Sequence, residues 1–158
     1  MYAIGDKIVY PPYGAGVIED IEEKEVDGQL LTYYALHIPV GNLKILISAA
    51  KAPTLGVRPI HAKGEMAGII QGIMNTPVVM SDNWNQRYKD NMELIKSGDL
   101  AAVSLVYRNL LLRERERGLS TAEKKMMTSA KQVILSELML SQEIEKAEAE
   151  IILDETFG

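Results

Sequence analysis

The spacing of apolar residues changes near residue 60, and this change divides the chain into two parts. In the first part, short β-branched and aromatic runs alternate with turn signals such as Asp27-Gly28 and Gly41-Asn42. The runs are Lys7–Tyr10, Val17–Ile21, Glu22–Val26, Leu30–Ile38 and Leu43–Ile47. Four or five short strands joined by tight turns predict a small Tudor- or SH3-like β-barrel over residues 1–52.

The second part, residues 64–158, repeats apolar residues every three to four positions, which predicts a compact domain of about five helices. Residues 53–63, with two prolines and a glycine, are the predicted linker, so the fold class is α+β. Cap signals place helix starts at Asn83, Asp99, Ser120 and Ser141. The predicted core-facing positions are Met66, Ile69, Ile70 and Ile73; Trp84, Tyr88, Met92 and Ile95; Val103, Val106, Tyr107, Leu110 and Leu111; Met127, Ala130, Ile134 and Leu138; and Ile144, Ala147, Ile151 and Ile152.

Composition narrows the classes of function. The absence of Cys excludes disulfides, thiolate metal sites and a Cys nucleophile, and only His37 and His61 supply imidazoles. Gly14-Ala-Gly16 lacks the remaining residues of a phosphate-binding loop and is predicted to be a turn. No catalytic constellation is present, so we expect a non-enzymatic protein without metal or cofactor. The chain has no long apolar run and no basic leader, which predicts a cytoplasmic protein without a membrane partner.

The net charge of −5 is unevenly distributed. Residues 81–131 carry 10 basic and 7 acidic side chains, whereas residues 132–158 carry 1 and 7. Because phosphate binding depends on local Lys and Arg, only the middle block suits nucleic acid. Within it, the alternating run Arg113–Arg117 fits a salt-bridged surface and a phosphate contact about equally well. The acids of the last helix are predicted to form a solvated face.

The single tryptophan, Trp84, permits two interpretations. Its helical spacing to Tyr88 and Met92 favours a core anchor, whereas its place at a helix start beside Arg87 and Lys89 suits stacking on a nucleic-acid base. On periodicity alone, core packing is favoured.

The chain as a whole resembles the CarD/CdnL family of bacterial transcription regulators. The motifs that carry the resemblance are Ile4–Pro11 with Gly14-Ala-Gly16, Asn83-Trp84 with Arg87-Tyr88-Lys89, Ser97-Gly-Asp99, and Glu116–Ser120 with Glu123-Lys124 and Met126. The first motif is similar to the polymerase-binding module of transcription-repair coupling factors. The remaining motifs are specific to the CarD/CdnL family.

The resemblance implies a Tudor-like domain that binds the β subunit of RNA polymerase and a helical domain that meets promoter DNA, largely independently of sequence. On the polymerase side it implies Lys24, together with Lys44 or an apolar contact at Leu46, where family members often carry a basic residue. On the DNA side it implies Trp84 as a wedge at the upstream edge of the bubble, where it stabilises the open complex. Phosphate contacts are expected from Arg87 and Lys89, then from Lys124 and Lys125. The chain is expected to act as a monomer at the nucleoid, bound through RNA polymerase; the alternative is a protein–protein adaptor without DNA contact.

Overall fold

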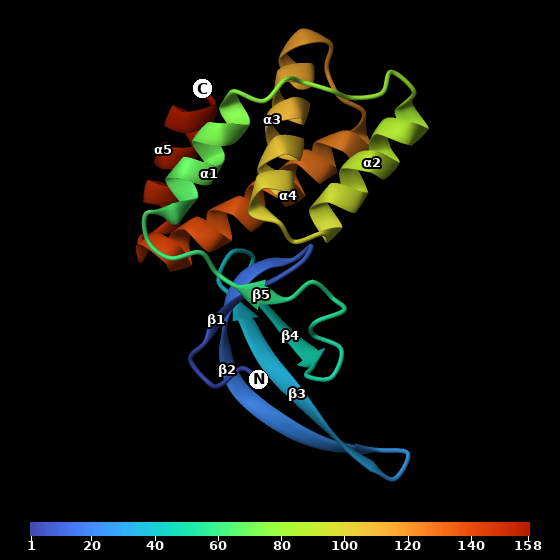
Figure 1. The fold of residues 1–158 in the computed structure, drawn as a ribbon, viewed down its shortest axis with the longest axis vertical. Coiled ribbons are helices and arrows are strands. Elements are labelled where there is room, and N and C mark those ends of the chain that lie inside the picture. The colour runs from blue at the N-terminus through green and yellow to red at the C-terminus, as the bar shows by residue number, and fades with distance from the viewer.

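A computed structural model describes all residues 1–158 and divides them into a sheet and a helical domain (Figure 1). The sheet contains β1 (Lys7–Tyr10), β2 (Gly14–Val26), β3 (Gln29–Ile38), β4 (Leu43–Ser48) and β5 (Arg58–Pro59). Its strands lie in the order β4-β3-β2-β1-β5, and every neighbouring pair is antiparallel. This confirms the predicted Tudor-like β domain followed by helices.

The hairpin between β2 and β3 extends away from the helices (Figure 1). Its turn residues Asp27 and Gly28 both have positive φ, as the Asp-Gly signal predicts. The runs predicted separately before Val26 form one strand with a register shift between Ile18 and Asp20. Gly14–Gly16 open this strand, so the predicted turn there is wrong; the turn is formed by the residues before it.

The helices are α1 (Glu65–Met74), α2 (Trp84–Lys96), α3 (Leu100–Glu116), α4 (Thr121–Gln142) and α5 (Lys146–Phe157). The side chains of Asn83, Asp99 and Ser120 each accept a hydrogen bond from a backbone N–H of the helix they precede, as predicted. Helix α4 packs against α3, α5 and β2, and the six residues from Val133 to Leu138 are all buried. None of the helices combines the length and apolar character that crossing a bilayer requires.

The last helix differs from the prediction. Ser141 does not cap it, because α4 continues to Gln142 and α5 begins after Glu145. This later start changes which positions face the core. The buried stripe of α5 is Ala149, Leu153 and Phe157, while Ile151 is 58% exposed.

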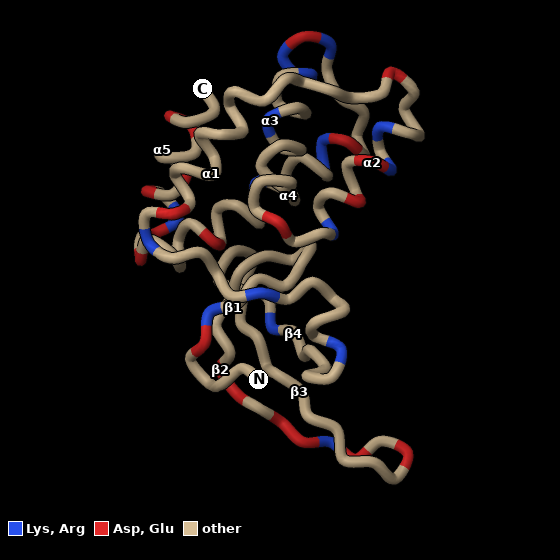
Figure 2. The backbone as a smooth tube through the Cα atoms, viewed as in Figure 1, with Lys and Arg blue, Asp and Glu red and all other residues tan.

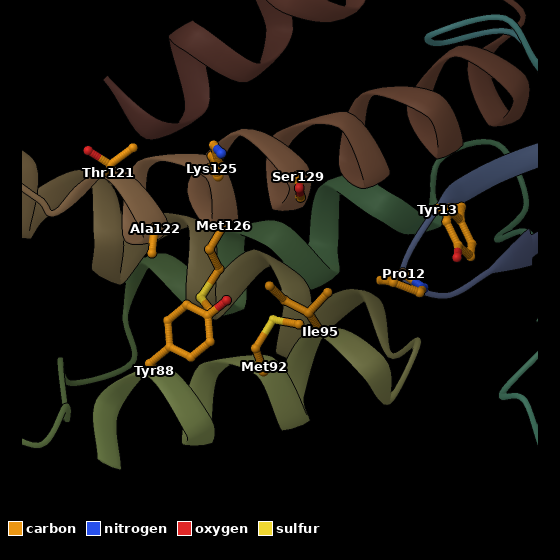
Figure 3. A pocket seen from close by; sticks show the side chains of 10 residues that line it. All are labelled: Pro12, Tyr13, Tyr88, Met92, Ile95, Thr121, Ala122, Lys125, Met126 and Ser129. Carbon is orange, nitrogen blue, oxygen red and sulfur yellow. The ribbon is translucent and has the colours of Figure 1, made fainter. Parts of the chain in front are cut away.

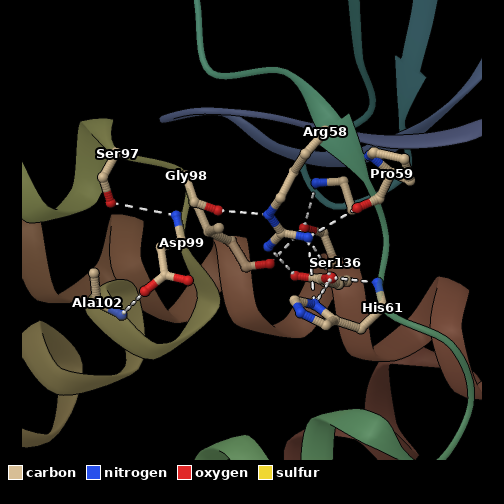
Figure 4. A network of polar contacts seen from close by, with 11 residues as sticks. Arg58, Pro59, His61, Ser97, Gly98, Asp99, Ala102 and Ser136 are labelled. Atoms are coloured by element: carbon tan, nitrogen blue, oxygen red, sulfur yellow. Dashed lines mark hydrogen bonds and ion pairs between the residues drawn. The ribbon is translucent and has the colours of Figure 1, made fainter.

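Strand β5 lies inside the segment predicted as a linker and brings Arg58 to the joint between sheet and helices (Figure 4). Its guanidinium donates two hydrogen bonds, of 2.9 and 2.7 Å, to the carboxylate of Glu137 on α4. Its Nε donates a third to the carbonyl of Gly98, at 2.7 Å. The backbone N–H of His61 donates to the same carboxylate at 2.8 Å, and the His61 ring nitrogen Nδ1 lies 2.9 Å from it. Glu137 is fully buried, so this network joins the two domains through one carboxylate.

Two close backbone approaches complete the joint. Ala15 N–H donates to Ser136 Oγ of α4 at 2.8 Å, and a Cβ on Gly14 would lie 2.7 Å from that oxygen. A Cβ on Gly98 would lie 2.5 Å from Pro11, and Gly98 also has a φ of +75°. The two glycines therefore allow the sheet and the helices to touch at a distance that alanine would prevent.

Burial raises the pKa of the Glu137 carboxyl, but the hydrogen bonds and charge of Arg58, with the bonds from His61, outweigh burial and hold it below its ordinary 4.5. The folded chain therefore binds fewer protons here than the unfolded chain, so this stabilisation is present above about pH 4.5 and disappears below it. We expect Glu137→Gln to lower the free energy of unfolding by about 3 kcal/mol at pH 7, because removing one member of a buried ion pair leaves the other uncompensated. Urea titrations from pH 7 to 3.5 should show the difference from wild type shrinking with acid.

The matched control is Glu143→Gln, which removes an exposed carboxylate 3.7 Å from Lys7 and should have little effect. Equal losses for the two variants would contradict the role of Glu137 as the joint.

Candidate functional site

The Trp84 indole stands at the first residue of α2 and remains 42% exposed. It stacks on Tyr88, with ring centroids 5.3 Å apart and 17° between the planes. Its Nε1–H donates to Ser120 Oγ, at the start of α4, at 3.1 Å. The ring is thus held from two helices while much of its surface stays open, so the interpretation of Trp84 as a core anchor, favoured by periodicity, is wrong.

The buried face of α2 is formed by Arg87, Asn91 and Ile95, while Tyr88 and Met92 are half-buried at its side. The predicted apolar stripe is therefore confirmed at Tyr88, Met92 and Ile95, which belong to the helical core or pack against it, and is wrong at Trp84. Compared with the orientation that the apolar spacing predicts, α2 is turned about its axis, because one of its charged residues has a buried partner on α4.

That charged residue is Arg87, which is 3% exposed and pairs with Glu123, 2% exposed. Its guanidinium donates to both carboxylate oxygens, at 2.8 and 3.1 Å, and to the carbonyls of Ser81 and Asp82. The hydrogen bond between them raises the pKa of Arg87 and lowers that of Glu123. The expectation that Arg87 contacts phosphate is therefore corrected: its donors are directed into the protein, where they fix the N-terminal end of α2.

The sequence names Glu123 as part of a family motif and gives no sign that it pairs with Arg87. Its backbone N–H donates to Ser120 Oγ at 3.2 Å, and its carboxylate accepts hydrogen bonds from both Arg87 and the Ser120 hydroxyl. The role of Ser120 as acceptor for the indole was missed as well. Its cap signal accounts for the helix start alone, and sequence contains no signal for a contact 36 positions away.

The three lysines predicted to face DNA are all exposed: Lys89 on α2 and Lys124 and Lys125 in the first turns of α4. Basic residues on α2 and at the start of α4 are interspersed with acidic ones such as Asp90 and Glu93, whereas β2 and α5 are predominantly acidic (Figure 2). In the alternating run, Arg115 donates to the carbonyl of Gly158, while Arg117 is exposed. The three lysines thus stay exposed on the two helices whose starts hold the Trp84 ring, whereas Arg87 is withdrawn into the protein.

A groove of about 540 Å³ begins at Tyr88 and runs between α2 and α4 toward the sheet (Figure 3). Met92 and Met126 line its walls, and Pro12 and Tyr13 from the loop after β1 close its far end. No pattern in the sequence predicted this groove, because its walls come from three separate segments. No group of three or more His, Asp or Glu side chains is placed to hold a metal ion.

The residues predicted to contact polymerase share one face of the sheet. Strand pairing sets Lys24 opposite Leu31, Lys44 opposite His37 and Leu46 opposite Ala35. Because alternate residues of a strand face the same way, these β3 partners all lie on the side opposite the buried Tyr34, Leu36 and Ile38. We call the face that carries Lys24, Lys44 and Leu46 the outer sheet face.

Two details describe this outer sheet face. Leu46 is 43% exposed on the edge strand β4, whose outer backbone groups have no neighbouring strand. Lys24 Nζ lies 6.0 Å from the centre of the Tyr33 ring. An exposed apolar side chain on an open edge strand, two residues from Lys44, is a surface suited to a protein partner.

Comparison with known proteins agrees with this division. Residues 2–61 match the family model described as the CarD-like/TRCF RID domain, and residues 69–154 match the model of the CarD C-terminal domain. The chain is also 35% identical over 138 residues to the putative transcription factor YdeB of Bacillus subtilis (strain 168), covering 87% of this chain and 90% of that protein. With both domain models and a full-length relative in agreement, this chain belongs to the CarD-like family of bacterial transcription factors, whose N-terminal domain interacts with RNA polymerase.

Proposed function

We propose that this chain binds the β subunit of RNA polymerase through its outer sheet face and stabilises the open promoter complex through Trp84. It does so without catalysing a reaction, by contacting DNA at the upstream edge of the bubble. The two surfaces lie in different domains, which the Glu137 network holds together. Binding at one surface therefore sets the position of the other.

The observation that carries the proposal is the placement of the indole. Trp84 is 42% exposed yet fixed by Tyr88 and Ser120, so little ordering is required when it meets a partner ring. Stacking on an unpaired base contributes about 1 to 3 kcal/mol, and only while the duplex is open. A ligand that binds the open state alone shifts the equilibrium toward it.

We assign the phosphate contacts to Lys89, Lys124 and Lys125, which are exposed on α2 and in the first turns of α4. Such contacts set position and orientation on DNA but do not read sequence, so many promoters would be served by one surface. Acids dominate β2 and α5, so α2 and the start of α4, which carry the three exposed lysines among fewer acids, are the more favourable approach for DNA.

The outer sheet face supports the polymerase contact. Leu46 supplies an apolar contact with Lys44 two residues away on β4, and Lys24 supplies a second charge nearer the β2–β3 turn. The net charge of −5 disfavours binding of this chain to DNA in solution. Tethering to polymerase would offset this by raising the local concentration of the chain at the promoter.

A second candidate is an adaptor that binds proteins through both domains and does not touch DNA. The loop before α2 favours it, since Val78 and Val79 are 50% and 82% exposed and offer an apolar contact. Variants at Trp84, Lys89 and Lys124 separate the two candidates.

We expect Trp84→Ala to lower the equilibrium constant for promoter opening in the presence of this chain by about 5- to 150-fold. This range corresponds to the loss of one base stack. Trp84→Phe should retain part of the effect. The measurement is the lifetime of polymerase–promoter complexes, with folding checked by circular dichroism. A folded Trp84→Ala chain with full stimulation would contradict the wedge.

Lys89→Gln should lower the salt dependence of complex formation on promoter DNA, with a log–log slope smaller by about 0.9 for one lost phosphate contact. Lys63→Gln, an exposed lysine before α1, is the control and should leave the slope unchanged. If Lys89→Gln and Lys124→Gln both keep the slope of the wild-type chain, the result would instead support the adaptor.

Leu46→Glu combined with Lys44→Ala should weaken binding to polymerase in the absence of DNA by at least about tenfold, because it places a desolvated charge in the apolar centre of the contact. Binding is measured by interferometry with immobilised polymerase. Lys51→Ala, exposed in the turn after β4, is the control. Undiminished affinity of the double variant would move the contact away from the outer sheet face.

A further inference from the structure

The groove between α2 and α4 is the strongest unassigned feature of the molecule. Its volume of about 540 Å³ lies within the range of roughly 300 to 1,000 Å³ typical of small-ligand sites. Tyr88 both stacks on Trp84 and lines the groove, so the groove begins one ring away from the indole.

The side chains that line the groove favour a ligand with a flat apolar part and a negative charge. Met92, Ile95 and Met126 supply apolar and polarisable surface, and thioethers make favourable contacts with aromatic rings. The only charged lining residue is Lys125, and no carboxylate lines the groove. A flat apolar group with an anion attached satisfies this lining, and a nucleotide has both parts.

Location supports the same ligand. In Figure 3 the side chains of Tyr88, Met92 and Met126 converge between the two helices, and Lys125 stands on the α4 wall. Thr121 and Ser129 add hydroxyl groups on that wall, suited to the polar edge of a base. A base that is still paired and stacked in a duplex cannot present its faces to such a groove, whereas an unpaired base can.

Resting on the proposed function, we infer that the α2/α4 groove binds a second unpaired nucleobase, the neighbour of the base on which Trp84 stacks, with Lys125 at its phosphate. Trp84 and the groove then form two successive base sites joined by the Tyr88 ring. Both sites are filled only when the duplex is melted, so the groove adds to the preference for the open complex that the indole creates.

The test fills the groove without altering Trp84. Ala122→Leu adds volume to the lining while keeping a good helix former on α4. The matched control is Ala67→Leu on the exposed side of α1, distant in the chain from this groove and lining a different hollow. Folding of both variants is checked by urea titration.

The readout is a double-mutant cycle on the lifetime of polymerase–promoter complexes. Abasic nucleotides are placed one at a time along the non-template strand at the upstream edge of the bubble. We expect one position, next to the one that responds to Trp84→Ala, at which base removal shortens the lifetime about three- to tenfold. On that abasic template Ala122→Leu should have no further effect, although it shortens the lifetime by a similar factor on normal DNA.

A 2-aminopurine probe at the same position provides an independent signal. Its emission should be quenched by wild type and by Ala67→Leu, but not by Ala122→Leu. Equal effects of Ala122→Leu on abasic and normal templates would mean that a protein side chain or the fold itself occupies the groove, and would overturn the inference. If those effects are equal while Trp84→Ala still abolishes stimulation, only the groove inference is wrong and the role of Trp84 stands. If Trp84→Ala also leaves stimulation unchanged, the proposed function is wrong as well.

Discussion

The fully buried carboxylate of Glu137 is the constraint on which the arrangement of the two domains depends. It is satisfied by Arg58 from the last strand and by His61 just beyond it, so the sheet can be placed in only one way on α4. Close contacts at Gly14 and Gly98 reinforce that placement. Two small domains with separate hydrophobic cores thus become one unit, in which the outer sheet face and the indole have a fixed relation.

A second buried ion pair fixes the position of α2, as the Glu137 network fixes the position of the sheet on α4. Arg87 and Glu123 fasten the start of α2 to the start of α4. This turns the apolar ring of Trp84 outward while a charged side chain occupies the interior, the reverse of the usual preference. The cost of burying two charges is offset by several hydrogen bonds with good geometry, and the result is an exposed aromatic ring on a rigid support.

Charged residues are distributed unevenly over the strands and helices. β2 and α5 are predominantly acidic, whereas basic and acidic residues are interspersed along α2 (Figure 2). Since the net charge of −5 disfavours binding to DNA in solution, the proposed function requires that polymerase carry the chain to the promoter. On that proposal the outer sheet face and the indole act together at one promoter.

The sequence by itself determined the elements that depend on local physics: the hairpin turn at Asp27, the caps at Asn83, Asp99 and Ser120, and the change from sheet to helices. It also identified the family, because the motifs around Trp84 are specific. Only the tertiary structure decided which face of α2 is buried, where α5 begins and what lines the groove. Those outcomes depend on partners such as Glu123 for Arg87, 36 positions away, and Glu137 for Arg58, 79 positions away, and no local periodicity contains such pairings.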